Sequence, residues 1–227
     1  GVSQGRCPDG AEKFIPLATP TPGSGNACPS EPVPPLTLPL LATTNIWRYE
    51  QSGTNLGTLW TGTDYDDSAW PQGPGVLGYE DDALPEPINT QLTTDVTKTN
   101  FYFRTTFFVP SNLNLSALPL THLIDDGAVF YLNGQEAYRY NMPDGPILAT
   151  TFALNSPDAT YVGPVNLPLT NVWAGTNLLA VEVHQKTPTS SDIVFGCKLD
   201  LLVLTNPPAA AGLVLNEVLA NNATLAE

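Results

Sequence analysis

The sequence predicts an all-β protein, an antiparallel β-sandwich with an extended proline-rich segment near its N-terminus. Short apolar segments rich in aromatic and β-branched residues alternate with turn signals along most of the chain. No segment carries a long helical period. The 23 prolines and 18 glycines form about 18% of the 227 residues, above the usual share of about 12% and below the roughly 25–30% typical of disorder. The chain is therefore expected to fold, with many turns.

Two proline-rich segments set the expected boundaries of the sandwich. CPSEPVPPLTLP (28–39) has five prolines in twelve residues. Because proline donates no backbone hydrogen bond, residues 28–41 are predicted to run as an extended linker. NPPAAAG (206–212) predicts a second linker, which leaves residues 42–205 for the sandwich.

Between the linkers, the sequence predicts a series of short strands. They are IWRY (46–49), GTLW (57–60), GVLGY (75–79), NFYFRTTFFV (100–109), AVFYLNG (128–134), NLLAVEV (177–183) and DIVFGCKLDLLVL (192–204). Alternation in the last strand predicts a core side with Phe195, Cys197, Leu199 and Leu201 and a wetter side with Val194, Gly196, Lys198 and Asp200. Asn133 and Gly134 predict a type I′ hairpin turn, and Gly127 predicts a bulge where its strand begins.

Four segments carry a family resemblance. They are DYDDSAWPQGPGVLGY (64–79), FYFRTTFFVP (101–110), DDGAVFYLNGQEAYRYNMP (125–143) and NLLAVEVHQKTPTSSDIVF (177–195). In this order they resemble a galactose-binding-like jelly-roll domain of large secreted bacterial proteins, over about residues 45–205. The resemblance implies a jelly-roll fold and an extracellular or cell-surface setting. It leaves the ligand open, because such domains bind sugars, bind other proteins or support their neighbours.

The two ends of the chain have a resemblance of their own. Residues 1–27 resemble the closing part of a lamin-tail-like β-sandwich, and residues 213–227 resemble the opening strand of another. Each end is then a fragment of its domain. Such ends are expected to pack on the central domain, or on the complementary end of another copy by strand addition.

The charge balance limits the possible partners. Eight Lys and Arg face 22 Asp and Glu, which gives a net charge of -14. This charge would repel nucleic acid and anionic membrane surfaces. It is compatible with calcium, with neutral sugars, or simply with solubility. The sequence contains no run of 18 or more apolar residues, so membrane insertion is not expected.

The three cysteines give two separate expectations. Cys7 and Cys28 lie in a segment rich in proline and glycine, where a disulfide could close a short loop, and bridged and unbridged forms both remain open. Cys197 lies in an apolar strand and is expected to be a buried small hydrophobe.

An acidic turn is a candidate metal site. Asp64, Asp66 and Asp67 place three carboxylates within four residues, and clustered hard oxygen ligands suit a structural calcium ion. Alternatively, Asp66 or Asp67 caps the turn by accepting backbone N–H groups. Trp70 beside the turn could cover the core or serve as a sugar platform.

A second group of polar residues is predicted to meet at the rim of the sandwich, where loops gather. Asp125 and Asp126 precede one strand, and the loop HQKTPTSSD (184–192) follows another. Carboxylate, amide and guanidinium groups could bind sugar hydroxyls, with Tyr138 or Tyr140 covering the ring. The ligand candidates are Asp125, Asp126, Arg139, Asn141, His184, Gln185, Ser191 and Asp192. The alternative is a network that satisfies itself, with Arg139 paired to an Asp and His184 bonded to a backbone carbonyl.

The sequence contains no catalytic signature of a common kind. GxSxG, HExxH, CxxC, P-loop and dinucleotide-binding patterns are absent, and His122 is placed in a linker-like run. We therefore expect a non-catalytic extracellular module of a larger protein that binds carbohydrate, with a possible structural calcium ion. The alternative function is a structural or interaction domain that joins neighbouring β-sandwich domains of a cell-surface protein and binds no small ligand.

Overall fold

The computed structural model describes residues 3–7, 9–17, 23–26, 34–93 and 98–205. The chain divides into two compact units. One unit is Pro35–Leu204, and the other contains the described residues up to Pro34 together with Thr205. In the described residues, no helix has the length and hydropathy needed to cross a membrane.

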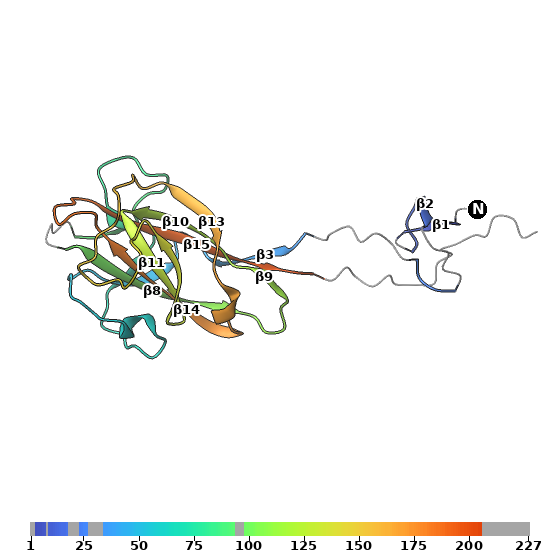
Figure 1. The fold of residues 1–227 in the computed structure, drawn as a ribbon, viewed down its shortest axis with the longest axis horizontal. Coiled ribbons are helices and arrows are strands. Elements are labelled where there is room, and N and C mark those ends of the chain that lie inside the picture. The colour runs from blue at the N-terminus through green and yellow to red at the C-terminus, as the bar shows by residue number, and fades with distance from the viewer. Residues whose placement is uncertain (1–2, 8, 18–22, 27–33, 94–97, 206–227) are drawn as a thin grey trace, which may run out of the picture. The chain divides into compact units, whose positions relative to one another are not determined.

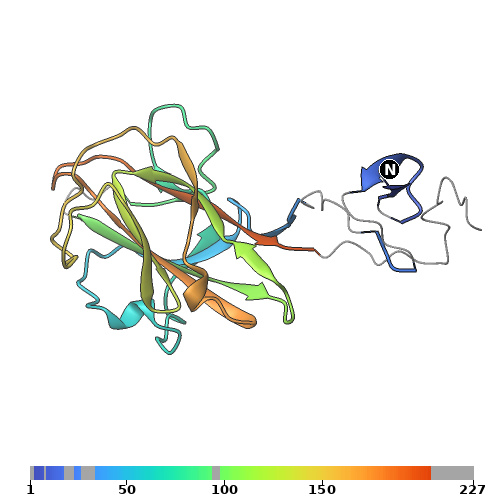
Figure 2. The same cartoon turned by 45° about the vertical axis from the view of Figure 1, so that its right-hand side comes forward.

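Pro35–Leu204 forms a sandwich of two β-sheets (Figures 1 and 2). In one sheet the strand order is β13-β10-β15-β6-β7, and β3 and β9 also pair with β15. In the other sheet the order is β12-β11-β14-β8-β4-β5. Every pairing in the sandwich is antiparallel except the short β6–β7 pair. The predicted all-β antiparallel sandwich is confirmed.

The strands of the first sheet are β3 (Leu36–Leu41), β6 (Leu77–Tyr79), β7 (Thr90–Gln91), β9 (Leu115–Ala117), β10 (Pro119–Asp125), β13 (Tyr161–Asn166) and β15 (Ile193–Val203). Those of the second sheet are β4 (Ile46–Glu50), β5 (Gln72–Pro74), β8 (Asn100–Val109), β11 (Gly127–Leu132), β12 (Gln135–Tyr140) and β14 (Gly175–His184). Two short 3-10 helices, η1 (Leu59–Thr61) and η2 (Leu169–Asn171), lie in the connections.

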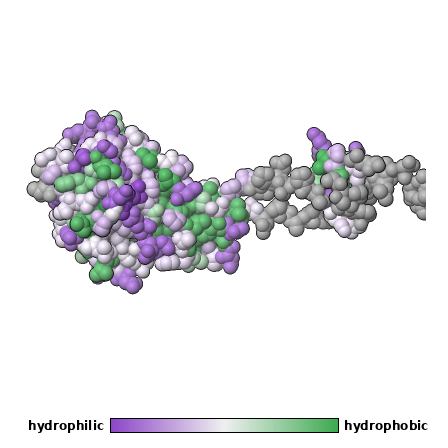
Figure 3. Space-filling model, in the orientation of Figure 1, coloured by the Kyte–Doolittle hydropathy of each residue, from purple (hydrophilic) through white to green (hydrophobic). Residues whose placement is uncertain are grey.

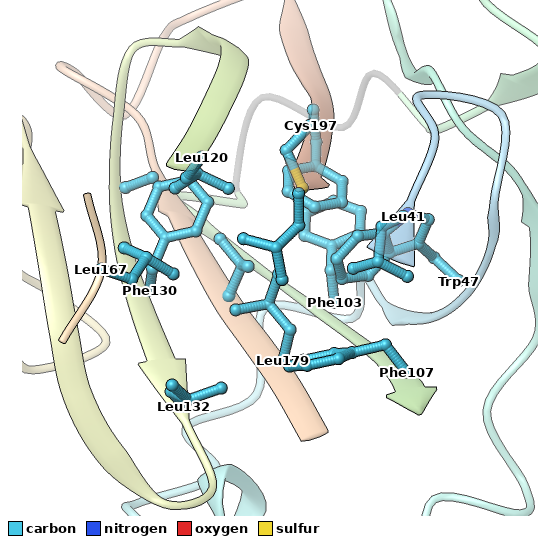
Figure 4. Packing of buried hydrophobic residues seen from close by; sticks show 14 of the residues in the cluster. Leu41, Trp47, Phe103, Phe107, Leu120, Phe130, Leu132, Leu167, Leu179 and Cys197 are labelled. Atoms are coloured by element: carbon cyan, nitrogen blue, oxygen red, sulfur yellow. The ribbon is translucent and has the colours of Figure 1, made fainter. Parts of the chain in front are cut away.

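The core lies between the two sheets and is rich in aromatic rings (Figure 4). Phe103 of β8 stacks on Phe195 of β15 with ring centroids 4.0 Å apart, and Trp47 of β4 meets Phe195 edge-on. Strands from both sheets thus share one aromatic cluster, because alternate side chains of each strand point inward.

The strand β15 follows its predicted alternation only in part. Phe195, Cys197, Leu199 and Leu201 are buried in the core as expected. On the other side Lys198 is exposed and Asp200 is half-buried, whereas Val194 and Gly196 are also buried. A second apolar cluster of Val76, Leu123, Ala159 and Val194 covers this side near the start of the strand.

The proline-rich segment is shorter than predicted. Leu36–Leu41 form β3, which pairs with β15, although the sequence placed residues 28–41 in a linker. Pro39 is tolerated here because the register shifts beside its partner Asp200, between Leu199 and Asp200, and proline is accepted at such irregular pairings. Residues 28–33 lie outside the described part of the chain.

The β11–β12 hairpin confirms one predicted turn and corrects a predicted bulge. Asn133 and Gly134 both have positive φ, 50° and 86°, as a type I′ turn requires. The register irregularity lies between Phe130 and Tyr131 and not at Gly127. Gly127 is needed for space, since an added Cβ would lie 2.7 Å from Met142 Sδ and 2.9 Å from Ala153 Cβ.

His122 lies in β10 and not in a linker. Its side chain is fully buried and faces Tyr140, Phe130 and Tyr138, with ring centroids 4.6, 5.5 and 5.7 Å away. Burial lowers the pKa of His122 to about 4. The residue is therefore a neutral part of the core.

In the other unit, β1 (Ser3–Arg6) and β2 (Phe14–Leu17) form an antiparallel hairpin. The guanidinium of Arg6 lies over the Phe14 ring, 5.1 Å from its centroid.

Cys7 is disulfide-bonded, and Cys28, its partner in the predicted bridge, lies outside the described residues. Cys197 is free and buried, as predicted. The predicted strand at 213–227 also lies outside the described residues.

Candidate functional site

The outer face of the six-stranded sheet carries an open groove of about 470 Å³, which we call the groove. It is lined by Ile46, Arg48, Thr63, Tyr65, Asp67, Gln72, Arg104, Thr105, Thr106, Thr176, Asn177 and Leu178. Most of these residues come from β4, β8 and β14, and the rest come from the segment 63–72 that folds over the sheet.

One buried guanidinium holds this segment in place. Arg104 is 4% exposed and forms an ion pair with Asp67 at 2.7 Å. Its remaining N–H groups donate to the backbone carbonyls of Trp60, Gly62 and Tyr65. Arg48 donates to further carbonyls of the same segment, at Asp67, Ser68 and Trp70. The groove wall is thus positioned by arginines of the sheet.

Several groove groups remain available to a ligand. In the described part of the chain, no hydrogen bond is made by the hydroxyl of Tyr65, by the amide of Gln72 or by the hydroxyl of Thr106. Phe108, 64% exposed, lies on the same face, two residues beyond Thr106 and directly opposite Thr176 in the β8–β14 register. Free polar groups therefore line the groove, and an exposed aromatic ring lies beside it on the same sheet face. In the view of Figure 3, the surface of the sandwich mixes hydrophilic and hydrophobic patches.

A second cleft, of about 500 Å³, lies at the rim of the sandwich, and we call it the acidic cleft. It is lined by Glu80, Asp82, Ala83, Leu84, Pro85, Asp125, Asp126, Ser156, Pro157, Asp158, Ala159, Thr160, Ser190 and Asp192. Six of these residues are acidic and none is basic. The end of β10 and the loops that follow β6, β12 and β14 meet here.

Three carboxylates converge in the acidic cleft. Oxygens of Glu80, Asp125 and Asp192 all lie within 4.8 Å of one another. Burial, a hydrogen bond with Asp126 and the charges of the neighbouring acids raise the pKa of Asp125 to about 8. Burial and the charge of Glu80 also raise the pKa of Asp192. Like charges thus crowd together in this cleft.

Several of the predicted rim residues do gather at the acidic cleft. Asp126 accepts the backbone N–H of Lys186 at 2.7 Å, and Asn141 donates to the backbone carbonyl of Asp126 at 2.9 Å. The buried Gln185 amide donates to the carbonyl of Asp192. Ser191 lines an adjoining depression with Asp192. Asp126, Asn141 and Gln185 are therefore engaged in holding the loops together.

Arg139 and His184 do not face this cleft. Arg139 pairs with Glu136 at 2.7 Å and donates to the carbonyls of Pro143 and Gly145. His184 is fully buried, with Nδ1 2.8 Å from the Thr151 carbonyl and Nε2 3.3 Å from Glu182. The contact of His184 with a backbone carbonyl matches the self-satisfied alternative, whereas Arg139 pairs with a glutamate and not with the predicted aspartate.

The acidic turn at residues 64–67 forms no cluster of ligand atoms. Asp66 Oδ1 accepts the backbone N–H of Ser68 at 3.0 Å, which is the predicted capping role. Hydrogen bonds from the side chain and the backbone of Ser68 lower the pKa of Asp66. Asp67 is bound by Arg104 and Arg48, and Asp64 is exposed. The group of acids that the structure brings within metal-binding distance in its described part is instead Glu80, Asp125 and Asp192.

The comparisons with known proteins give partial structural matches. No family model and no curated protein matches the chain. Among solved structures, a calcium-binding mutant of Bacteroides uniformis beta-glucuronidase 2 matches 73% of this chain at 15% identity and TM-score 0.47. A beta-glycosidase from Bacteroides vulgatus matches 74% at 14% identity and TM-score 0.43. A beta-glucuronidase from Ruminococcus gnavus, in complex with C6-substituted uronic isofagomine, matches 78% at 12% identity and TM-score 0.46.

This chain spans only a small part of those enzymes, namely 18%, 20% and 30% of the three chains. At such identities and TM-scores, the similarity assigns no substrate, metal or catalytic residue to this protein.

Sequence reasoning missed Glu80 and most of the groove. Glu80 begins the acidic run EDD directly after the apolar segment GVLGY, and this run could have indicated a further group of acids at a strand end. The groove had a signal as well, because Tyr102, Arg104, Thr106 and Phe108 alternate with core residues in β8.

Proposed function

We propose that Pro35–Leu204 is a non-catalytic extracellular recognition module that binds carbohydrate in the groove. The observation that carries the proposal is an open groove with unpaired hydroxyl and amide groups, bordered on the same sheet face by the exposed Phe108 ring. Sugars need both kinds of contact, since their hydroxyls form hydrogen bonds and their C–H faces pack on aromatic rings. The volume of about 470 Å³ also falls within the range of about 300–1,000 Å³ typical of ligand sites.

The charges of the groove favour a sugar over a polyanion. Asp67 offsets one of the two arginines, so Arg48 and Arg104 leave about one unit of positive charge in a chain whose net charge is -14. A neutral oligosaccharide or one with a single uronic acid fits this balance, whereas a nucleic acid would be repelled by the rest of the surface. The sequence resemblance to galactose-binding-like domains of secreted proteins supports the same function and setting.

The test is a glycan-array screen of the whole chain, covering neutral and uronic oligosaccharides. Gln72→Ala removes a groove amide and Phe108→Ala removes the exposed ring beside the groove. Each should weaken binding about tenfold or more, since each removes about 1.4 kcal/mol or more of contact. Leu148→Ala, which truncates a 61% exposed apolar side chain elsewhere, is the matched control and should bind as the wild type does.

The screen also separates the groove from the rim. Asp125→Asn should leave oligosaccharide binding unchanged, because Asp125 lines the acidic cleft and not the groove. Loss of binding in Asp125→Asn together with full binding in Phe108→Ala would move the sugar site to the rim. Silence of the wild type across the array would contradict carbohydrate recognition.

A further inference from the structure

We propose that the acidic cleft binds a divalent cation, Ca²⁺ by its chemistry, through the carboxylates of Glu80, Asp125 and Asp192. This site is separate from the groove and does not depend on sugar binding. It also differs from the calcium site that the sequence suggested at Asp64, Asp66 and Asp67.

The first argument is the position of the three carboxylates. Glu80 directly follows β6, Asp125 is the last residue of β10, and Asp192 directly precedes β15. β15 pairs with both β6 and β10, so the sheet itself fixes these three backbone positions side by side. Their oxygens lie within 4.8 Å of one another, close enough to share one ion.

The second argument is that Asp125 is buried without a donor. Asp125 is only 5% exposed and lines the cleft. In the described part of the chain, no N–H group or alcohol donates to its carboxylate, and its hydrogen-bonding neighbour is the acid Asp126. Buried carboxylates are normally met by N–H donors, by cationic side chains or by a metal. Since this cleft is lined by no Lys, Arg or His, no basic side chain of its lining balances these acids, whereas a bound cation would.

The third argument concerns the kind of ion. All the ligand atoms that the cleft offers are oxygens, from carboxylates, from the hydroxyls of Ser156, Thr160 and Ser190, and from loop backbone. Ca²⁺ takes six to eight oxygen ligands in flexible geometry, whereas Zn²⁺ prefers nitrogen and sulfur. Loops that supply three acids, with water completing the shell, match Ca²⁺ better than the compact octahedron of Mg²⁺.

The experiment uses the whole chain, stripped with a chelator and then titrated with Tb³⁺ and with CaCl₂. Tyr79 lines the depression next to Glu80 and Asp192 and can sensitise Tb³⁺ luminescence. We expect one Tb³⁺ per chain, displaced by Ca²⁺, and a melting temperature that rises with Ca²⁺. Asp125→Asn and Asp192→Asn should each weaken Ca²⁺ binding tenfold or more, while the control Asp64→Asn should bind as the wild type does.

A second readout guards against misfolded variants. In chelator, Asp125→Asn should melt at or above the wild-type temperature, because an amide of the same size adds no negative charge to the acidic cleft at any pH. Glu80→Gln serves as the independent variant if Asp125→Asn does not fold. The proposal is overturned if the wild type neither binds Tb³⁺ nor gains stability in about 10 mM Ca²⁺, which exceeds the weakest extracellular sites of roughly 1 mM. Equal Ca²⁺ affinity of the wild type and the folded variants, or loss of binding in Asp64→Asn alone, overturns it as well.

Discussion

At the scale of single residues, His122 makes folding sensitive to acid. Its ring has no hydrogen-bond partner in the described residues and is surrounded by aromatic rings, so burial lowers its pKa from 6.5 to about 4. Between these two values the unfolded chain binds a proton that the folded chain excludes. This contribution to the free energy of unfolding is therefore complete above pH 6.5 and falls as the pH drops toward 4, by up to about 3 kcal/mol.

His122→Leu should remove this part of the pH dependence. Urea denaturation of wild type and variant at pH 7 and pH 4.5 measures it. The wild type should lose about 2–3 kcal/mol more than the variant between these two conditions. Carboxylates titrate in both proteins, so the difference between the two slopes isolates His122. Parallel slopes would mean that the ring is already protonated or solvated in the folded protein.

A second residue-scale prediction concerns Gly127, where the backbone passes close to its neighbours. Gly127→Ala would place a Cβ within 3.0 Å of Met142, Ala153 and the Asn141 carbonyl. Overpacking of this kind lowers the free energy of unfolding by about 1–3 kcal/mol. Gly62→Ala is the matched control, since its Cβ would meet nothing closer than the Leu59 carbonyl at 3.5 Å, and should change stability by less than about 0.5 kcal/mol. Equal denaturation midpoints of the two variants would contradict the packing around Gly127.

At the scale of elements, Arg104 joins β8 to the segment 60–67. Arg104→Met leaves Asp67 without its closest cation and frees three backbone carbonyls, so we expect a loss of about 2–4 kcal/mol of stability. The segment should also become cleavable by protease in the native state, which mass spectrometry of limited digests would detect. Lys198→Met, on an exposed position of β15, is the control and should lose less than about 0.5 kcal/mol. A variant as stable and as protease-resistant as this control would show that Arg104 does not anchor the segment.

The same strand shows how far the sequence could predict the elements. The alternation of β8 is imperfect because both of its faces are covered near its start. Phe101 and Phe103 face the core, whereas Tyr102 and Arg104 lie under the segment that contains Trp60 and Tyr65. Short apolar segments and the Asn133–Gly134 turn depend on local chemistry, so they could be predicted. Leu36–Leu41 could not, because its strand pairing depends on β15, more than 150 residues away.

The residues of the candidate sites likewise could be predicted only where their position does not depend on distant strand pairing. Asp125, Asp126 and Asp192 were predicted to share a rim, because strand ends of a sandwich gather their loops. Glu80 could not be joined to them without knowing that β6 and β10 both pair with β15. His184 was misjudged as a rim donor, since its strand continues one residue past the predicted end and buries the ring.

At the scale of the whole molecule, one sandwich carries two separate candidate sites. The groove lies on the outer face of the six-stranded sheet, and the acidic cleft lies at the rim where β6, β10 and β15 meet. No residue lines both sites. Sugar binding should therefore be insensitive to chelation, and cation binding should be insensitive to changes in the groove.

The most direct measurement is backbone amide NMR of the whole chain, titrated with the oligosaccharide panel and, in a separate sample, with CaCl₂. We expect oligosaccharide-induced shifts along β4, β8 and β14 around Arg48, Thr106 and Thr176. We expect Ca²⁺-induced shifts around Glu80, Asp125 and Asp192 instead. Oligosaccharide shifts centred on the acidic cleft, or no shifts with any sugar, would contradict the assignment of carbohydrate recognition to the groove.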